Sequence, residues 1–190
     1  MSGFDINIKD LKEFRQIDSK TPGHPEVFVT PGVDASTGPL GQGIATAVGM
    51  SASQKYLSDK FGGLLDYNVY VLCGEGDLME GISYEACSLA GNLKLGNLIV
   101  LYDSNKVTLD GDAKKSFDED ILKRFDAMGW HTDVVLDGEN HLLIDMAISK
   151  AKRVIDKPSF IEIKTTIGKG SVLEGTNKVH GAVLTKEDIR

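Results

Sequence analysis

The chain has 190 residues, of which 41% are hydrophobic and 26% are charged, the composition of an ordinary globular domain. Its formal charge of −7 argues against DNA or RNA as a partner, because basic side chains must replace the counterions of a polyanion. No apolar run approaches the roughly 20 residues that span a bilayer, and the segment from Met1 to Asp5 carries no secretory signal. We therefore expect neither a nucleic-acid partner nor a membrane protein.

Cysteine and glycine usage adds two expectations. Cys73 and Cys87 each lie within an apolar stretch, which is typical of reduced core thiols, so we expect a cytoplasmic protein. Glycine accounts for 21 of the 190 residues, about 11% against a usual ~7%. The glycines are not spread as linkers, and this enrichment indicates close approach of the backbone to a ligand.

The N-terminal part of the chain predicts two helices and one strand. A short helical stretch over residues 8–14 precedes a loop rich in glycine and proline at residues 21–26. A second glycine-rich loop, residues 37–43, leads into a helix over residues 44–57, whose small residues permit tight packing. The β-branched and aromatic run at residues 67–72 predicts a buried strand that ends at a glycine.

The rest of the chain alternates between helical and strand patterns. Four strands that alternate with helices predict an α/β fold, a doubly wound parallel sheet with helices on both faces. Without repeats or a long linker, residues 1–190 are expected to form a single domain. The predicted elements are a helix over 82–90 with Gly91 as its C-cap, a strand over 98–102, a helix over 117–128 stopped by Gly129, a strand over 131–136, a helix over 141–155 and a strand over 160–163.

Ligands of such sheets bind beyond the carboxyl ends of the strands. The loops expected there are residues 74–77, 103–107 and 165–170, the last of which precedes a stretch with His180. Glycines allow backbone N–H groups to approach phosphate oxygens. Carboxylate and amide oxygens are hard ligands that suit Mg²⁺ or Ca²⁺. These loops predict a site for a phosphorylated cofactor with a bound cation.

Each of these residues also has a purely structural interpretation. Gly-Glu-Gly is most often a tight turn, and Gly74, Gly76 and Gly81 do not match the dinucleotide pattern G-x-G-x-x-G. Asn105 alone is typical of a turn, and His24 alone could be an ordinary loop histidine. His131 and His141 are interpreted as a strand start and a helix entry. The order of the loops along one alternating fold favours the functional interpretation.

Taken together, these loops resemble the pyrophosphate-binding region of transketolases, which are thiamine diphosphate enzymes. The resemblance covers essentially the whole chain. It rests on six stretches, Ser19-Lys-Thr-Pro-Gly-His-Pro-Glu26, Thr37-Gly-Pro-Leu-Gly-Gln-Gly43, Gly74-Glu-Gly-Asp-Leu-Met-Glu-Gly81, Leu93-Lys-Leu-Gly-Asn-Leu98, Tyr102-Asp-Ser-Asn-Lys-Val107 and Val179-His-Gly181.

The resemblance implies a role for each residue of the diphosphate and metal site. Gly76 would place its backbone N–H on the diphosphate. Asn105 would contribute its side-chain oxygen, and Val107 its carbonyl, to a divalent cation, Mg²⁺ or Ca²⁺. Glu75 stands where the family signature Gly-Asp-Gly has aspartate. Its one extra methylene moves the carboxylate that would ligate the metal by about 1.5 Å, and Mg²⁺ demands near-ideal ligand distances. Asp77 is not expected to replace it.

Further roles follow from the same resemblance. Gly38 and Leu40 would lie along the cofactor and Ile167 would pack near its thiazolium ring, while His24 and His180 would act at the reaction centre or on substrate hydroxyls. His180 would also contact the cofactor. Glu80 and Glu85 match acidic positions of the family's dimer interface, although an exposed helix face explains them equally well.

The activity implied by the resemblance is transfer of a two-carbon ketol unit from a ketose phosphate to an aldose phosphate, a step of the pentose phosphate pathway. The chain is expected to supply only the diphosphate- and metal-binding half. We expect it to lack the family's upstream segment and the pyrimidine-binding domain that activates the cofactor, and therefore expect the chain alone to be inactive. Its expected partners are sugar phosphates and that complementary domain or chain, in a homodimer or a heterotetramer.

Two other functions remain open from the sequence. A related thiamine diphosphate enzyme, such as a deoxyxylulose phosphate synthase, would share the fold, but the loops at residues 21–26 and 37–43 favour transketolase. A catalytically silent fragment or binding subunit is the alternative from another class. Glu75 and the expected lack of those segments favour it.

Overall fold

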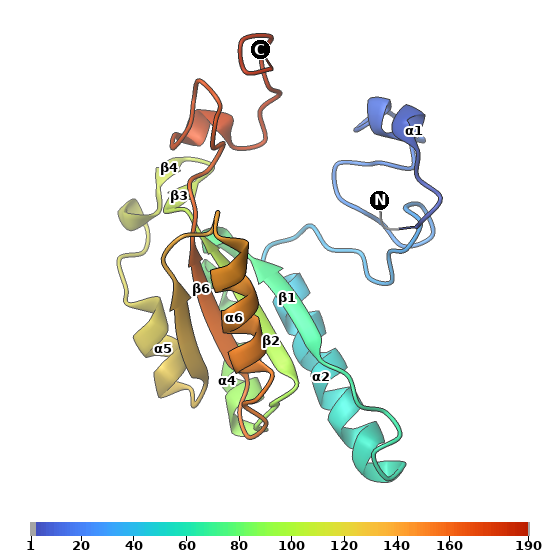
Figure 1. The fold of residues 1–190 in the computed structure, drawn as a ribbon, viewed down its shortest axis with the longest axis vertical. Helices are drawn as coiled ribbons and strands as arrows, with labels where there is room; N and C mark the ends of the chain where they lie inside the picture. Colours follow the sequence, from blue (N-terminus) through green and yellow to red (C-terminus); the bar gives the residue numbers. More distant parts are fainter. Residues whose placement is uncertain (1–2, 190) are drawn as a thin grey trace.

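The computed structural model describes residues 3–189. Its centre is a four-stranded parallel sheet with the strand order β1-β2-β6-β5 (Figure 1). The predicted α/β class and parallel sheet are confirmed. The strands are β1 (Val69–Cys73), β2 (Leu98–Ser104), β5 (His131–Val135) and β6 (Ser159–Lys164), and a separate hairpin consists of β3 (Val107–Thr108) and β4 (Gly111–Asp112).

Six α-helices are present in residues 3–189, and four of them cover the two faces of the sheet unequally. Helices α2, α4 and α5 pack against one face, and α6 alone packs against the other. The helices are α1 (Ile8–Lys12), α2 (Gln42–Lys60), α3 (Glu75–Met79), α4 (Gly81–Asn92), α5 (Ile121–Ala127) and α6 (His141–Ala151), and two 3₁₀ turns cover Ala113–Lys115 and Asn177–Val179.

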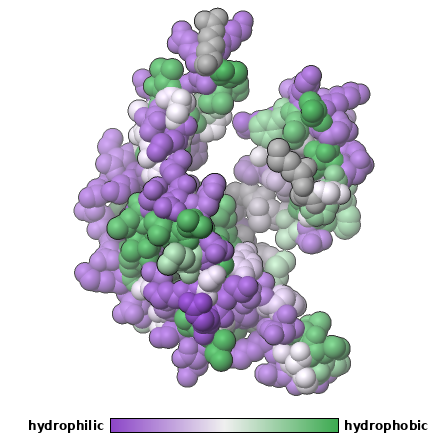
Figure 2. Space-filling view, viewed as in Figure 1, coloured by the Kyte–Doolittle hydropathy of each residue, from purple (hydrophilic) through white to green (hydrophobic). Residues whose placement is uncertain are grey.

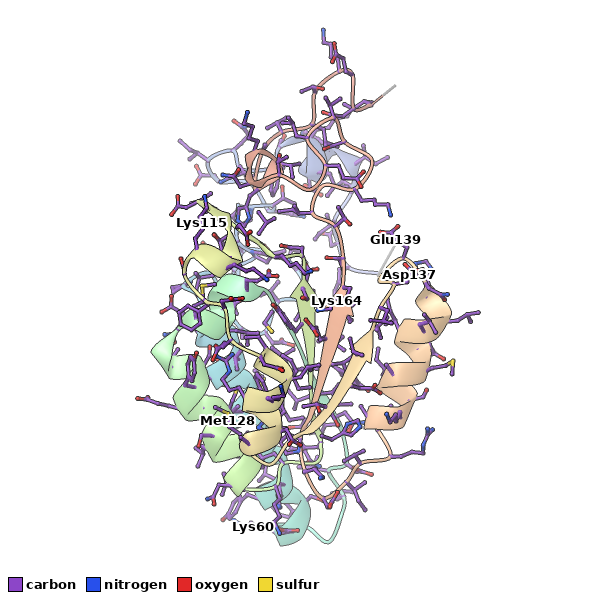
Figure 3. All side chains as sticks on the ribbon, turned by 90° about the vertical axis from the view of Figure 1, so that its left-hand side faces the viewer. Lys60, Lys115, Met128, Asp137, Glu139 and Lys164 are labelled. Carbon is purple, nitrogen blue, oxygen red and sulfur yellow. The ribbon has the colours of Figure 1, made fainter. Side chains whose placement is uncertain are left out.

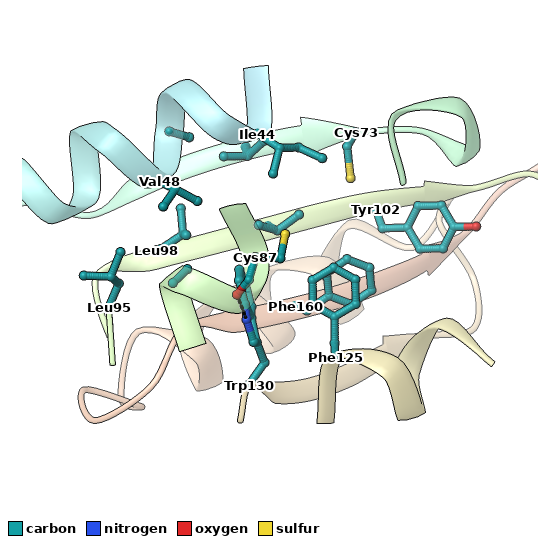
Figure 4. Close-up of a cluster of buried hydrophobic side chains, with 14 of the residues drawn as sticks. Ile44, Val48, Cys73, Cys87, Leu95, Leu98, Tyr102, Phe125, Trp130 and Phe160 are labelled. Atoms are coloured by element: carbon teal, nitrogen blue, oxygen red, sulfur yellow. Dashed lines mark hydrogen bonds between the residues drawn. The ribbon is translucent and has the colours of Figure 1, made fainter. Parts of the chain in front are cut away.

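The main core lies between the sheet and the three helices of the first face (Figure 4). The Phe125 ring of α5 stacks on Phe160 of β6 at 3.7 Å between centroids, and it meets Trp130 edge to face at 5.1 Å. The Trp130 indole N–H donates to the Cys87 carbonyl at 2.9 Å, so the one polar atom of that buried ring is paired. Cys73 and Cys87 are free and buried, as predicted.

Two helix boundaries differ from the sequence expectation. Gly91 is not a C-cap but lies inside α4, whose C-cap is Leu93. The helix predicted over residues 117–128 begins only at Ile121, because the Asp120 side chain accepts the Lys123 N–H and caps α5 there. Gly129 does end that helix, with a φ of +82° that favours glycine.

The second face is only partly covered. Tyr70 and Leu72 of β1 point away from the main core and are exposed. Apolar side chains also gather on the outer surface of α6, where Leu142 and Met146 are exposed (Figure 2).

Among residues 3–189, none of the helices has the length and apolar character needed to cross a membrane.

One ion pair fastens α6 to the edge strand, and it predicts a pH-dependent stability. The Lys150 ammonium of α6 donates to the Asp133 carboxylate of β5 at 2.9 Å. Burial raises the pKa of Asp133, but Lys150 and the Val134 amide outweigh it and hold the pKa below its ordinary value. The stabilisation is therefore present above the unfolded-state pKa, about 3.9, and it is lost as the pH falls through the folded-state pKa.

Asp133→Asn is expected to lower the free energy of unfolding by roughly 0.5–1 kcal/mol at pH 7, a value reduced by the exposure of Lys150. The difference in the free energy of unfolding between the wild type and Asp133→Asn should shrink by pH 3. Urea titrations of both proteins at pH 7, 5 and 3 measure it, and a difference that is constant across these pH values would contradict the assignment.

Candidate active site

The parallel strands place their carboxyl ends at one edge of the sheet, and the predicted site loops meet there. The N-terminal and C-terminal segments both extend beyond this edge (Figure 1). Lys164 marks the end of β6 in a view from the side, and Lys115 lies beyond it (Figure 3). The edge is therefore surrounded by loops that come from distant parts of the sequence.

Glu75 links the first two of these loops. It is the first residue of α3, directly after β1, and its side chain is buried with only 7% exposed. Its Oε1 accepts the Lys106 backbone N–H at 2.5 Å and the Tyr102 hydroxyl at 3.3 Å. Lys106 lies between the two other predicted metal ligands, so one carboxylate joins the loop after β1 to the loop after β2.

Asn105 and Val107 form the other half of this arrangement. The Asn105 Oδ1 accepts the Val107 N–H at 3.0 Å, and its amide group donates to Asp103 at 3.1 Å. Both residues are half-buried. They line a cavity of about 430 Å³ together with residues 175–177 of the C-terminal segment. The amide orientation is thus set by two partners, and one oxygen lone pair remains for a further contact.

The chemistry of this donor set fits a hard divalent cation. Burial raises the pKa of Glu75, which the Lys106 amide partly offsets, and a neighbouring positive charge is the usual way to keep a buried carboxylate ionised. No group of three His, Cys, Asp or Glu side chains able to hold a metal occurs within residues 3–189. A cation here would rely on one carboxylate, neutral oxygens and the oxygens of a phosphorylated ligand, as Mg²⁺ commonly does.

The structure brings two further pairs of predicted residues together. A Cβ at Gly38 would lie 3.5 Å from the His24 ring, and a Cβ at Gly76 would lie 3.1 Å from the Leu40 side chain. Leu40 therefore contacts the loop after β1, and the His24 ring lies next to Gly38 in the loop at residues 37–43. His24 is itself exposed.

The C-terminal candidates lie on a different segment. His180 is exposed and follows the 3₁₀ turn Asn177–Val179. The Asn177 side-chain amide of this turn donates a hydrogen bond to the Leu109 carbonyl of the β3–β4 hairpin at 3.2 Å. The Ile167 carbonyl accepts the Gly175 N–H at 2.9 Å. No hydrogen bond within residues 3–189 connects His24 to His180, so the structure does not pair the two histidines directly.

Glu80 and Glu85 lie outside this cluster. Glu80 separates α3 from α4, Glu85 is on α4, and both side chains are exposed. Glu85 is the one charged residue of α4. Their role at a dimer interface stays a prediction.

Sequence reasoning missed the role of Asp77. Its Oδ1 accepts the Gly41 N–H at 2.9 Å, and its Oδ2 accepts the Gly74 N–H at 3.0 Å. The Ser83 hydroxyl donates to the Asp77 carbonyl at 2.5 Å. One aspartate thus fixes the loop at residues 37–43 to the loop after β1. The carboxylate three residues after Gly74 was a signal for this role, because Asp at that spacing caps a helix start.

A second cavity, of about 250 Å³, opens beside the Glu75 side chain. It lies between the ends of β2 and β6 and the segment that precedes α5. Polar groups at its base pair with one another, since the Ser104 hydroxyl donates to Glu162 at 2.8 Å and Lys164 forms an ion pair with the same carboxylate. Glu75 thus lines this cavity, whereas Asn105 and Val107 line the other one.

Comparisons with known proteins agree with these observations. The family model described as "Transketolase, thiamine diphosphate binding domain" matches residues 1–190. The transketolase of Bacillus subtilis is 55% identical over 193 residues, covering 99% of this chain and 29% of that protein. The transketolase of Aquifex aeolicus is 51% identical over 191 residues, covering 98% of this chain and 28% of that protein.

Solved structures show the same relationship. A transketolase from Leishmania mexicana superposes with a TM-score of 0.95 at 49% identity, covering 98% of this chain and 29% of that one. A Pichia stipitis transketolase in complex with sedoheptulose-7-phosphate gives a TM-score of 0.95 at 46% identity, covering 98% of this chain and 28% of that one. The chain thus spans under a third of the length of these relatives, and it belongs to the transketolase family, matching the thiamine diphosphate binding domain.

Proposed function

We propose that this chain binds the diphosphate of thiamine diphosphate with Mg²⁺ at the carboxyl edge of its sheet, as one part of a transketolase. In the whole enzyme it would serve transfer of a two-carbon ketol unit from a ketose phosphate to an aldose phosphate. The observation that carries the proposal is the hydrogen bond that the Lys106 backbone N–H donates to Glu75 Oε1 at 2.5 Å. It supports the proposal because it draws the loops after β1 and β2 around one buried carboxylate.

The residues have distinct roles in binding. Glu75, the Asn105 side-chain oxygen and the Val107 carbonyl would hold the cation, which neutralises the diphosphate. The Gly76 backbone would approach the diphosphate, and the absence of a side chain there keeps room beside Leu40. Asp77 contributes indirectly, since it fixes the loop that carries Gly38 and Leu40.

The remaining candidates act on the reacting groups. Thiamine diphosphate, when bound, supplies a stabilised carbanion centre at its thiazolium ring. His24 and His180 would bind substrate hydroxyls and hold or move protons there, because imidazole donates or accepts at one position. Ile167 would pack against the ring and help to exclude water. The exposed positions of His24 and His180 suit an interface that a pyrimidine-binding domain or chain completes, in a homodimer or heterotetramer.

Calorimetric titration with thiamine diphosphate at fixed Mg²⁺ tests the binding role. Asn105→Ala is expected to weaken binding about tenfold, the effect of one lost contact to a charged group. Asn68→Ala is the matched control, because Asn68 directly precedes β1 at the opposite end of the sheet. The affinity of this variant for thiamine diphosphate should equal that of the wild type. Equal affinities in all three proteins would contradict the metal assignment.

The same titration addresses the alternative of a catalytically silent binding subunit. A silent subunit that has lost the cofactor site would show no heat with thiamine diphosphate and Mg²⁺ in the chain or in its complex with a complementary domain. The relatives described above are transketolases, which gives a deoxyxylulose phosphate synthase no added support.

A further inference from the structure

Tyr102 connects the hydrophobic core to the candidate cation site. Its ring is buried at 5% exposed and lies 5.7 Å from the Phe160 ring between centroids. Its hydroxyl points away from the core cluster, toward the carboxyl end of β2 (Figure 4). That hydroxyl donates to Glu75 Oε1 at 3.3 Å. A side chain whose ring is fixed by packing therefore presents a polar group to the carboxylate proposed to bind metal.

Strand register explains why this contact is built into the fold. Cys73 on β1 is paired with Tyr102 on β2, and Tyr102 is in turn paired with Glu162 on β6. Glu75 follows Cys73 by two residues, where the chain has just turned into α3. The hydroxyl and carboxylate meet because β1 and β2 run parallel in this register, so neither depends on a flexible surface loop for its position.

Both hydrogen bonds to the Glu75 carboxylate within residues 3–189 use the same oxygen. Oε1 accepts the Lys106 N–H and the Tyr102 hydroxyl, whereas Oε2 accepts neither. A carboxylate held in this way has one oxygen available to a cation and the other engaged by the protein. Mg²⁺ requires near-ideal octahedral geometry with few protein ligands, whereas Ca²⁺ accepts bidentate carboxylates and irregular shells.

We propose that Tyr102 is a positioning residue that restricts Glu75 to a single ligating oxygen and thereby makes the site prefer Mg²⁺ over Ca²⁺. This inference rests on the proposed function, because it deepens the same cation site. Tyr102 acts through Glu75 and touches neither cofactor nor substrate in this role. The selectivity arises from where the hydroxyl is held, and the core ring holds it.

Tyr102→Phe tests this role, because it removes the hydroxyl and keeps the ring in the core. The affinity for thiamine diphosphate is measured by calorimetry with saturating Mg²⁺ and then with saturating Ca²⁺. We expect the ratio of the two affinities to fall roughly threefold in favour of Ca²⁺, a part of the effect of one hydrogen bond to a charged group. Urea titration of each protein shows separately what the hydroxyl contributes to stability.

Tyr84→Phe is the matched control. The Tyr84 hydroxyl also donates to a carboxylate, that of Glu119 at 2.8 Å, but Glu119 is not among the proposed cation ligands. This variant should leave the ratio unchanged. If Tyr102→Phe weakens binding equally with both cations, or not at all, Tyr102 has only a structural role and the inference is overturned. If the wild type binds with neither cation, the cation site itself is wrong and the inference fails with the proposed function.

Discussion

Gly91→Ala is expected to lower the free energy of unfolding by about 3 kcal/mol, the upper end of the usual range for overpacking a core. A Cβ built at Gly91 would lie 1.9 Å from the Met128 carbonyl oxygen and 3.3 Å from the Trp130 ring. The obstacle is backbone, so no side-chain rotation relieves it. Helix α4 must move away from the segment after α5, which opens the core around Phe125 and Trp130.

Gly49→Ala is the control for this substitution. Gly49 lies inside α2 and is exposed, and a Cβ there would meet no atom within 4 Å beyond its own part of the helix. Alanine there should raise the free energy of unfolding by about 0.5–1 kcal/mol, because glycine is the weaker helix former. Urea unfolding of the two variants beside the wild type measures both changes. Similar shifts for both would show that helix propensity, and not the close approach of α4 to Met128, decides the outcome at Gly91.

The same glycine shows where sequence reasoning reaches its limit. Glycine after an apolar helical run is a common C-cap signal, and Gly91 fits that signal. The true requirement comes from Met128, which is 37 positions later in the chain. A contact between distant segments leaves no local pattern, so Gly91 carries the signal of a helix end although its role is close packing.

All four strands of the parallel sheet were predicted to within two residues at each end. β2 and β6 are buried over most of their length, and continuous apolar runs of this kind have few alternative structures. The short helix α3 was missed, because its five residues include two carboxylates and too few apolar residues for a helical period. The hydrogen bonds of Asp77, and not amphipathicity, define that turn.

The candidate site was predicted by loop position but not by contact. Parallel strands must end at one edge, so the sequence could place Glu75, Asn105 and Val107 near one another. The hydrogen bond between Tyr102 and Glu75 depends on the register of β1 against β2, which the alternation of apolar residues does not specify. For the same reason no pattern predicted that Asp77 would bond to Gly41, 36 positions away in the chain.

Asp77→Ala is expected to lower the free energy of unfolding by roughly 3 kcal/mol, since it removes two hydrogen bonds to a charged acceptor. The Gly41 and Gly74 N–H groups would lose their partner. Gly41 has a φ of +78°, and a Cβ there would lie 2.8 Å from the Ser83 hydroxyl, so this loop packs closely against the start of α4. Hydrogen exchange should accelerate at Gly41 and Gly74 beyond the change in global stability.

Two further variants test whether the loss of stability in Asp77→Ala comes from its hydrogen bonds to the glycine loops. Asp77→Asn keeps the size of the side chain but replaces one acceptor oxygen with an amide group, so about half of the loss should remain. Asp120→Ala removes an exposed N-cap that accepts the Lys123 N–H at 3.1 Å, and it should cost about 1 kcal/mol without faster exchange at Gly41. Because the loop at residues 37–43 carries Gly38 and Leu40, Asp77→Ala should also weaken thiamine diphosphate binding in Mg²⁺, whereas Asp120→Ala should not. Unchanged protection of the Gly41 amide in Asp77→Ala would show that the two glycine loops are held together by other contacts, and that Asp77 serves only the start of α3.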